Sequence, residues 1–73
     1  MGVPGNLVRT LRDAYHQAPP GDVAVRIHLF GIAHAEELEG VNRKELCALA
    51  EISENWATEI HKGMRLSEYV TLR

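Results

Sequence analysis

The apolar side chains in the first part of the chain recur three or four positions apart, which is the spacing of one helix face. They are Leu7, Leu11, Ala14, Tyr15 and Ala18. Asn6 can cap the start of this helix with its side-chain oxygen. Pro19 and Pro20 stop it, because proline has no amide hydrogen to donate and restricts the residue before it. The pattern predicts a helix over residues 6–17.

The next stretch, residues 23–39, carries two overlapping patterns. Apolar residues alternate with polar or small residues over 23–29, which is typical of a strand. Large side chains also recur at helical intervals, at Ile27, Phe30, His34 and Leu38. The length of the stretch, Asp22 as an N-cap and Gly40 as a terminator favour one helix. In that helix Gly31 would let another backbone approach closely. The alternative is a short strand at 23–29 that leads into a shorter helix.

Asn42 opens the helix with the clearest start signal in the chain. Glu45 follows three residues later, so the two form a capping box, in which each side chain binds a free amide at the helix start. Val41 and Leu46 occupy the two positions of a hydrophobic staple across this cap. The pattern predicts a helix that runs to about residue 50.

A second short helix follows a break at Glu51 and Ile52. Ser53 is placed to cap this helix, and Gly63, directly after Lys62, is placed to end it. Two capped helices joined by a turn of only a few residues have the layout of a helix-turn-helix.

Residues 42–63 resemble the helix-turn-helix family, in particular its repressor-like members. The family has a small residue where the two helices cross, and Cys47 stands at that position; Ile60 matches the buried aliphatic residue of the second helix. Glu51 stands where the family usually has glycine in a left-handed conformation, which a larger residue adopts at a modest cost. Ala57 stands where the family usually has a larger aliphatic residue.

The whole chain, residues 1–73, is predicted to form one domain, because 73 residues are too few for two independent cores. We expect an all-α fold, a small helical bundle of about four short helices that contains the helix-turn-helix-like unit at 42–63. The remaining segment is rich in apolar residues and is expected to dock on the bundle; it contains Leu66, Tyr69, Val70 and Leu72.

The resemblance implies that the second helix of the unit enters the major groove of DNA. Asn55 and Thr58 would then face base edges, since asparagine can pair with adenine and threonine can contact a thymine methyl group. Basic residues around the unit would contact phosphates; they are Arg43, Lys44, Lys62 and Arg65. One chain offers few phosphate contacts, so this function implies a homodimer on two half-sites.

The charge of the chain favours a different function. Lys and Arg number 8 against 10 Asp and Glu, a net charge of −2, whereas DNA-binding proteins usually carry a basic surface. Glu54 and Glu59 lie on the second helix and would repel phosphates. The alternative function is a non-catalytic protein-interaction or dimerisation module that has the helix-turn-helix shape and binds no DNA. Trp56 would then anchor a protein interface, unless its ring packs onto the first helix or the C-terminal segment as part of the core.

No residue pattern in the chain indicates catalysis, a metal ion or a cofactor. Cys47 has no second cysteine to pair with and is expected to be a small buried residue, and no two of the four histidines are three or four positions apart. The chain has no phosphate-binding glycine loop, so we predict no enzyme and no small-molecule substrate. The longest apolar run, residues 29–33, is too short to span a membrane. A single cysteine fits a reducing compartment, so we expect a cytoplasmic module.

Overall fold

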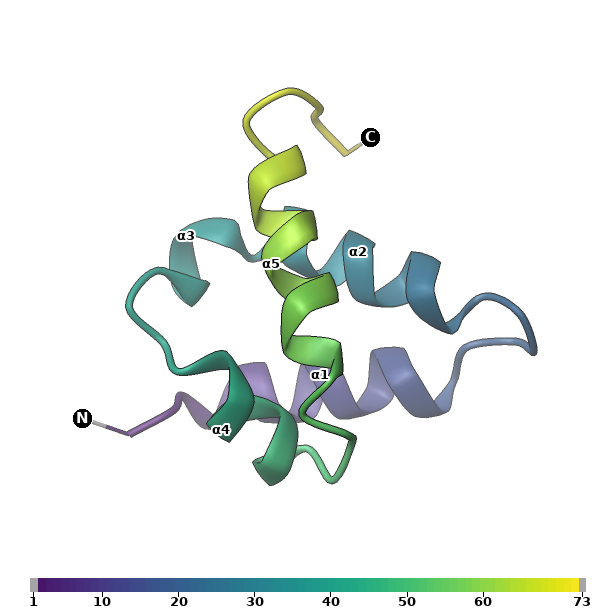
Figure 1. Cartoon of the computed structure of the whole chain (residues 1–73), viewed down its shortest axis with the longest axis vertical. Helices are drawn as coiled ribbons and strands as arrows, with labels where there is room; N and C mark the ends of the chain where they lie inside the picture. The colour runs from purple at the N-terminus through teal and green to yellow at the C-terminus, as the bar shows by residue number, and fades with distance from the viewer. Residues whose placement is uncertain (1, 73) are drawn as a thin grey trace.

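The computed structural model describes residues 2–72, in which the chain forms five helices and no strand (Figure 1). The helices are α1 (Gly5–His16), α2 (Val23–Ala33), α3 (Ala35–Leu38), α4 (Arg43–Leu49) and α5 (Trp56–Leu66). The predicted all-α class is confirmed, with five helices in place of about four. α1 packs against α2, and α5 crosses in front of α2 (Figure 1).

One cluster of buried apolar side chains holds the helices together. Leu7 and Leu11 are fully buried one turn apart on α1, as their helical spacing predicts. Every helix contributes to the cluster, which includes Leu7, Leu11, Ile27, Phe30, Leu38, Leu46, Cys47, Ile60 and Met64. Burial of one such leucine or isoleucine contributes about 1.5–3 kcal/mol. The cluster is therefore the main source of stability in this small domain.

The start of α1 differs slightly from the prediction. Pro4 is the N-cap residue, and no side chain makes a capping hydrogen bond there. Asn6 lies inside the helix, where its side-chain Nδ2 donates to Oε2 of Glu37 at 3.4 Å. The predicted cap at Asn6 is wrong, because the fixed φ of Pro4 lets the helix begin earlier.

The ambiguous stretch 23–39 is helical, so the strand alternative at 23–29 is wrong. The stretch is not one helix, however, because His34 leaves the helical conformation with φ −117° and ψ 23°. His34 is both the C-cap of α2 and the N-cap of α3. Its ring forms a 2.7 Å hydrogen bond with Glu37, which ties the break to the first turn of α3. Leu38 at the end of α3 is fully buried.

Two glycines lie at the crossing of α2 and α5. A Cβ on Gly31 would lie 2.5 Å from the carbonyl oxygen of Ile60 and 2.9 Å from the Cα of Gly63. A Cβ on Gly63 would meet the carbonyl oxygen of His28. The close approach expected at Gly31 is confirmed. Gly63 does not end the last helix, since α5 continues to Leu66, and its role is to let the two backbones touch.

The turn between α4 and α5 contains a left-handed residue. Glu51 has a φ of 64°, in the region that favours glycine. The next amide, of Ile52, donates to the carbonyl of Cys47 at 3.0 Å, and the Ile52 side chain is buried. The turn thus has the backbone conformation that the family resemblance implies, with a glutamate where glycine is usual.

The substitution Glu51→Gly is expected to raise the free energy of unfolding by about 1 kcal/mol, because glycine adopts the left-handed conformation without strain. The ion pair lost with Arg12 has a 3.8 Å separation and side chains that are 41% and 78% exposed, so its contribution is small. Urea denaturation measures the change. As a control, Ala48→Gly on the exposed face of α4 should lower the same free energy by about 1 kcal/mol. A Glu51→Gly variant less stable than the wild type would contradict the prediction.

Candidate functional site

The helix-turn-helix unit consists of α4, the turn at 50–55 and α5. Oδ1 of Asn42 accepts a hydrogen bond from the amide of Glu45 at 3.0 Å, so the predicted cap of α4 is confirmed. Oγ of Ser53 accepts one from the amide of Asn55 at 3.2 Å. Ser53 therefore caps a single turn, and α5 itself begins at Trp56, later than the sequence pattern suggests.

Cys47 lies fully buried on α4, at the side that faces the core. Burial raises the pKa of its thiol to about 11, and the nearby negative charge of Glu54 adds to the increase. A thiol with this pKa stays protonated at neutral pH. The prediction that Cys47 is a small buried residue is confirmed.

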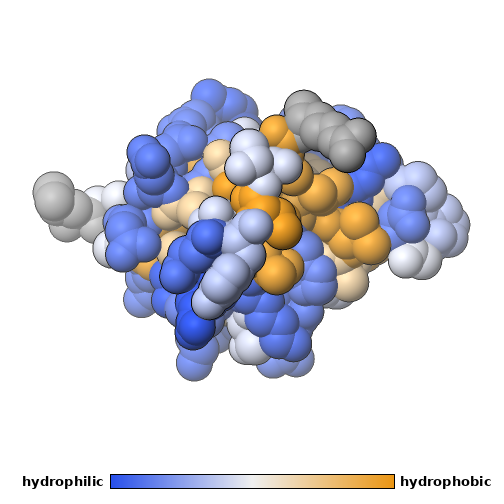
Figure 2. Space-filling model, turned by 90° about the horizontal axis from the view of Figure 1, so that it is seen from above, coloured by the Kyte–Doolittle hydropathy of each residue, from blue (hydrophilic) through white to orange (hydrophobic). Residues whose placement is uncertain are grey.

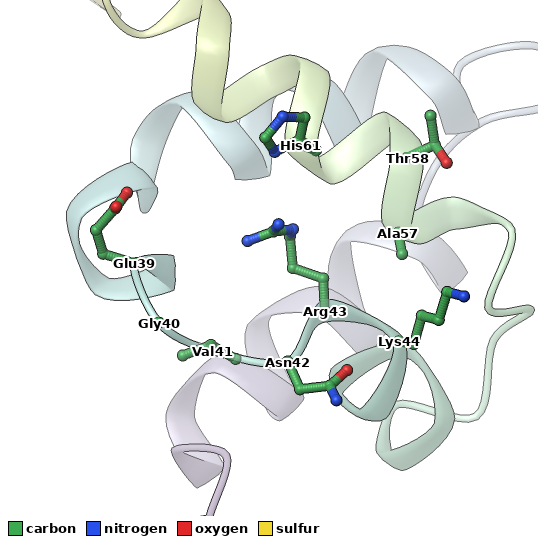
Figure 3. Close-up of a pocket in the computed structure, with 9 residues that line it drawn as sticks. All are labelled: Glu39, Gly40, Val41, Asn42, Arg43, Lys44, Ala57, Thr58 and His61. Atoms are coloured by element: carbon green, nitrogen blue, oxygen red, sulfur yellow. The ribbon is translucent and has the colours of Figure 1, made fainter.

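An open hollow lies between α4 and α5, beside the loop that follows α3 (Figure 3). Its volume is about 740 Å³. Arg43 and Lys44 line it from the start of α4, and Thr58 and His61 line it from α5. Figure 3 shows the side chain of Arg43 extending from α4 toward His61 on α5 across this space. Two predicted phosphate contacts and one predicted base contact thus share one site.

The two basic residues of the hollow lie at different depths. Arg43 is half-buried, and its Nη1 donates to Sδ of Met64 at 3.7 Å, so its guanidinium crosses toward α5. Lys44 is exposed on the same side as Thr58 (Figure 3). Glu39 lines the opposite edge of the hollow. The site therefore carries two positive charges against one negative charge.

Lys62 and Arg65 lie on a second hollow, of about 420 Å³, with His28, Leu66 and Tyr69. Lys62 pairs with Glu59 at 3.2 Å, and Arg65 pairs with Glu68 at 3.7 Å. The four predicted phosphate contacts are therefore not gathered at one place. His61 lines both hollows, so it connects the two pairs of basic residues along the exposed face of α5.

Glu59 does not face outward with the other polar residues of α5. Its Oε1 forms a 2.8 Å hydrogen bond with Nε2 of His28 on α2, and its side chain is only 25% exposed. The hydrogen bond with His28, and after it the contact with Lys62, lowers the pKa of the Glu59 carboxyl. The two partners are 31 positions apart, so no local pattern could reveal the pair. Glu59 is thus largely removed from the surface on which it was expected to oppose a polyanion.

The first residues of α5 differ in exposure. Asn55 is exposed, has a helical backbone conformation and makes no side-chain capping bond. Thr58 follows one turn later and is also exposed. Trp56 is half-buried, and its ring packs edge-on against Tyr15 of α1 with 5.9 Å between ring centroids. Part of the Trp56 indole surface is therefore buried against α1.

Arg12 of α1 has a role that the sequence did not reveal. Its Nη2 donates to the carbonyl oxygen of Leu49 at 3.0 Å, at the C-terminal end of α4. A helix end has free carbonyl groups and a partial negative charge, so a cation there is stabilising. This bond fixes α4, and with it the turn, to α1.

The described part of the chain, residues 2–72, contains no cluster of side chains suited to hold a metal ion. None of its helices has the length and apolar character needed to cross a membrane.

Comparison with known proteins identifies one relationship. No curated protein and no solved structure matches the chain. A family model described as an HTH-like domain matches residues 5–73, well beyond the unit at 42–63 where the resemblance was first noted. Since this match covers almost the whole sequence, the chain belongs to the HTH-like domain family.

Proposed function

We propose that the chain is a regulatory module that binds double-stranded DNA, with the first half of α5 in the major groove and the start of α4 against the phosphate backbone. The observation that carries the proposal is the shared hollow, which Arg43 and Lys44 of one helix line together with Thr58 and His61 of the next. In helix-turn-helix complexes the second helix reads base edges while neighbouring elements hold the backbone.

The exposed face of α5 supports this placement. Asn55, Thr58 and Lys62 recur three and four positions apart, so they lie on one face, and all three are exposed. Asn55 and Thr58 would contact base edges. Lys62 and Arg65 would contact phosphates further along the groove, where a phosphate replaces the carboxylates that now pair with them.

The acidic residues oppose DNA binding less in the folded chain than the sequence suggests. A net charge of −2 would oppose DNA binding if it were spread over the whole surface. Glu54 stays exposed beside Asn55, but Glu59 is held by His28 and Lys62, and Glu36 and Glu37 line a separate hollow with the C-terminal segment. The face that would meet DNA is therefore less acidic than the composition implies.

The test is the salt dependence of duplex binding, measured by nitrocellulose filter binding with a mixed-sequence duplex. Affinity should fall as salt rises, because binding releases counterions from the phosphates. Lys44→Gln should weaken binding by about three- to tenfold and reduce the salt slope by about one unit, since one phosphate contact is lost. Binding that does not change with salt would refute the proposal.

Arg9→Gln is the matched control for Lys44→Gln. Arg9 is also an exposed cation, but it lies on the face of α1 opposite the buried Leu7 and Leu11 and away from the hollow. Both substitutions remove one positive charge from the chain. An equal loss of affinity in both variants would show that only net charge matters and would contradict the assignment of the hollow.

A further inference from the structure

α2 carries apolar side chains on its outer face as well as on its inner face. Ile27 and Phe30 point into the core, while Val25 and Leu29 are 52% and 39% exposed. Ile32 lies one turn beyond Leu29 on the same outer face. A helix that is apolar all round is normally covered on every side. The outer face of α2 therefore lacks the cover that its composition predicts.

The C-terminal segment extends this apolar surface. Val70 and Leu72 are 46% and 41% exposed and line one hollow together with Ile32. Figure 2, which views the molecule from above, shows hydrophobic residues gathered across this end. We call this surface the apolar end; it consists of Val25, Leu29, Ile32, Val70 and Leu72. A contiguous apolar surface of this kind marks an interaction site.

We propose that the apolar end is covered by a second copy of this chain, related by a two-fold axis that sets the two α2 helices antiparallel. The charges beside the surface support this occupant. Arg26 is exposed near the start of α2, and Glu36 and Glu37 are exposed beyond its end. An antiparallel arrangement brings Arg26 of each copy toward the acidic pair of the other. A two-fold interface forms this contact twice, because Arg26 of either copy faces Glu36 and Glu37 of the other copy.

The orientation of α5 agrees with this arrangement, and this step rests on the proposed function. A two-fold axis along the line of sight of Figure 1 keeps α5 of both copies on the same side. The dimer would therefore present both recognition surfaces to one face of a duplex.

Sedimentation equilibrium tests the interface directly. The wild type is expected to show twice the 8.2 kDa mass of one chain. Leu29→Glu should weaken the dimer by about tenfold or more, because it places an unpaired charge at the centre of an apolar contact. Leu49→Glu is the matched control, since Leu49 is 48% exposed on α4, away from the apolar end. It should leave the dissociation constant unchanged.

A charge exchange tests the antiparallel register. Arg26→Glu and Glu36→Arg should each weaken the dimer, and the double variant should restore it, because the pair is rebuilt with opposite signs. Circular dichroism of each variant confirms that the helices are intact. A double variant no better than the single ones would overturn the register.

The two proposals can fail separately. A wild type that remains a monomer overturns the dimer, even if the monomer binds DNA with the expected salt dependence; the apolar end would then serve a different protein. A dimer that is disrupted by Leu29→Glu but binds no duplex supports the interface and refutes the proposed DNA-binding function.

Discussion

Gly63→Ala is expected to destabilise the fold by about 3 kcal/mol, which is most of the stability of a domain of this size. The added Cβ would overlap the carbonyl oxygen of His28 and lie 2.9 Å from the Cα of Gly31. Both obstacles are backbone atoms, so no side-chain rotation relieves the clash. α5 would have to move away from α2 along the largest helix contact in the chain. Urea denaturation followed by circular dichroism measures the loss.

Gly5→Ala is the matched control. Gly5 is also helical, but a Cβ there would meet only Nη1 of Arg9, at an unstrained 3.8 Å. Alanine is the better helix former, so this variant should equal the wild type or exceed it by up to about 1 kcal/mol. The same helix preference favours alanine at Gly63, so a loss of stability there must come from the clash between the two helices. A Gly63→Ala variant as stable as the wild type would show that the two helices can separate without cost.

Cys47 is expected to resist thiol reagents in the folded chain and to make the fold sensitive to alkali. Burial raises the pKa of the thiol from 9.0 to about 11, so the thiolate fraction at neutral pH falls about a hundredfold. In the unfolded chain the thiol ionises at its ordinary pKa. Below about pH 9 the thiol is neutral in both the folded and the unfolded chain, so its burial costs no stability. As the pH rises from 9 toward 11 only the unfolded chain ionises, and the free energy of unfolding falls by about 3 kcal/mol in total.

Denaturation midpoints measured from neutral pH to pH 11 test this dependence. Cys47→Ala is the control, because it removes the titrating group while the tyrosines and lysines remain. It should be less stable than the wild type at neutral pH by about 1 kcal/mol, for the small cavity it leaves. Its stability should then fall less between pH 9 and 11. Parallel pH profiles for the two proteins would contradict the prediction.

The sequence predicted the elements whose signals are local. The cap at Asn42 and the buried leucines of α1 each depend on residues within a few positions, and the structure confirms both. The left-handed conformation at Glu51, which the family resemblance implies, is also present. The stretch 23–39 was ambiguous for a physical reason. α2 is apolar on both faces, so neither period dominates in its sequence, and only packing against two neighbouring helices selects the helix.

The errors concern contacts between distant segments. Gly63 has the signature of a helix end, but it serves a backbone contact with α2 that no local rule can reveal. The pairing of Glu59 with His28 is likewise invisible along the chain, although it holds the Glu59 carboxylate against α2. The sequence analysis also missed that His61 lines the hollow, and its place one turn after Thr58 was the available signal.

Trp56 supplies the molecule with its own optical reporter. It is the one tryptophan of the chain, and its indole rests against Tyr15 where α5 meets α1. A duplex that grips the first turn of α5 will alter the environment of the indole and therefore its emission. Association through the apolar end, at the other end of α5, leaves that environment unchanged. Intrinsic fluorescence can thus follow the first event independently of the second, without a dye on either partner.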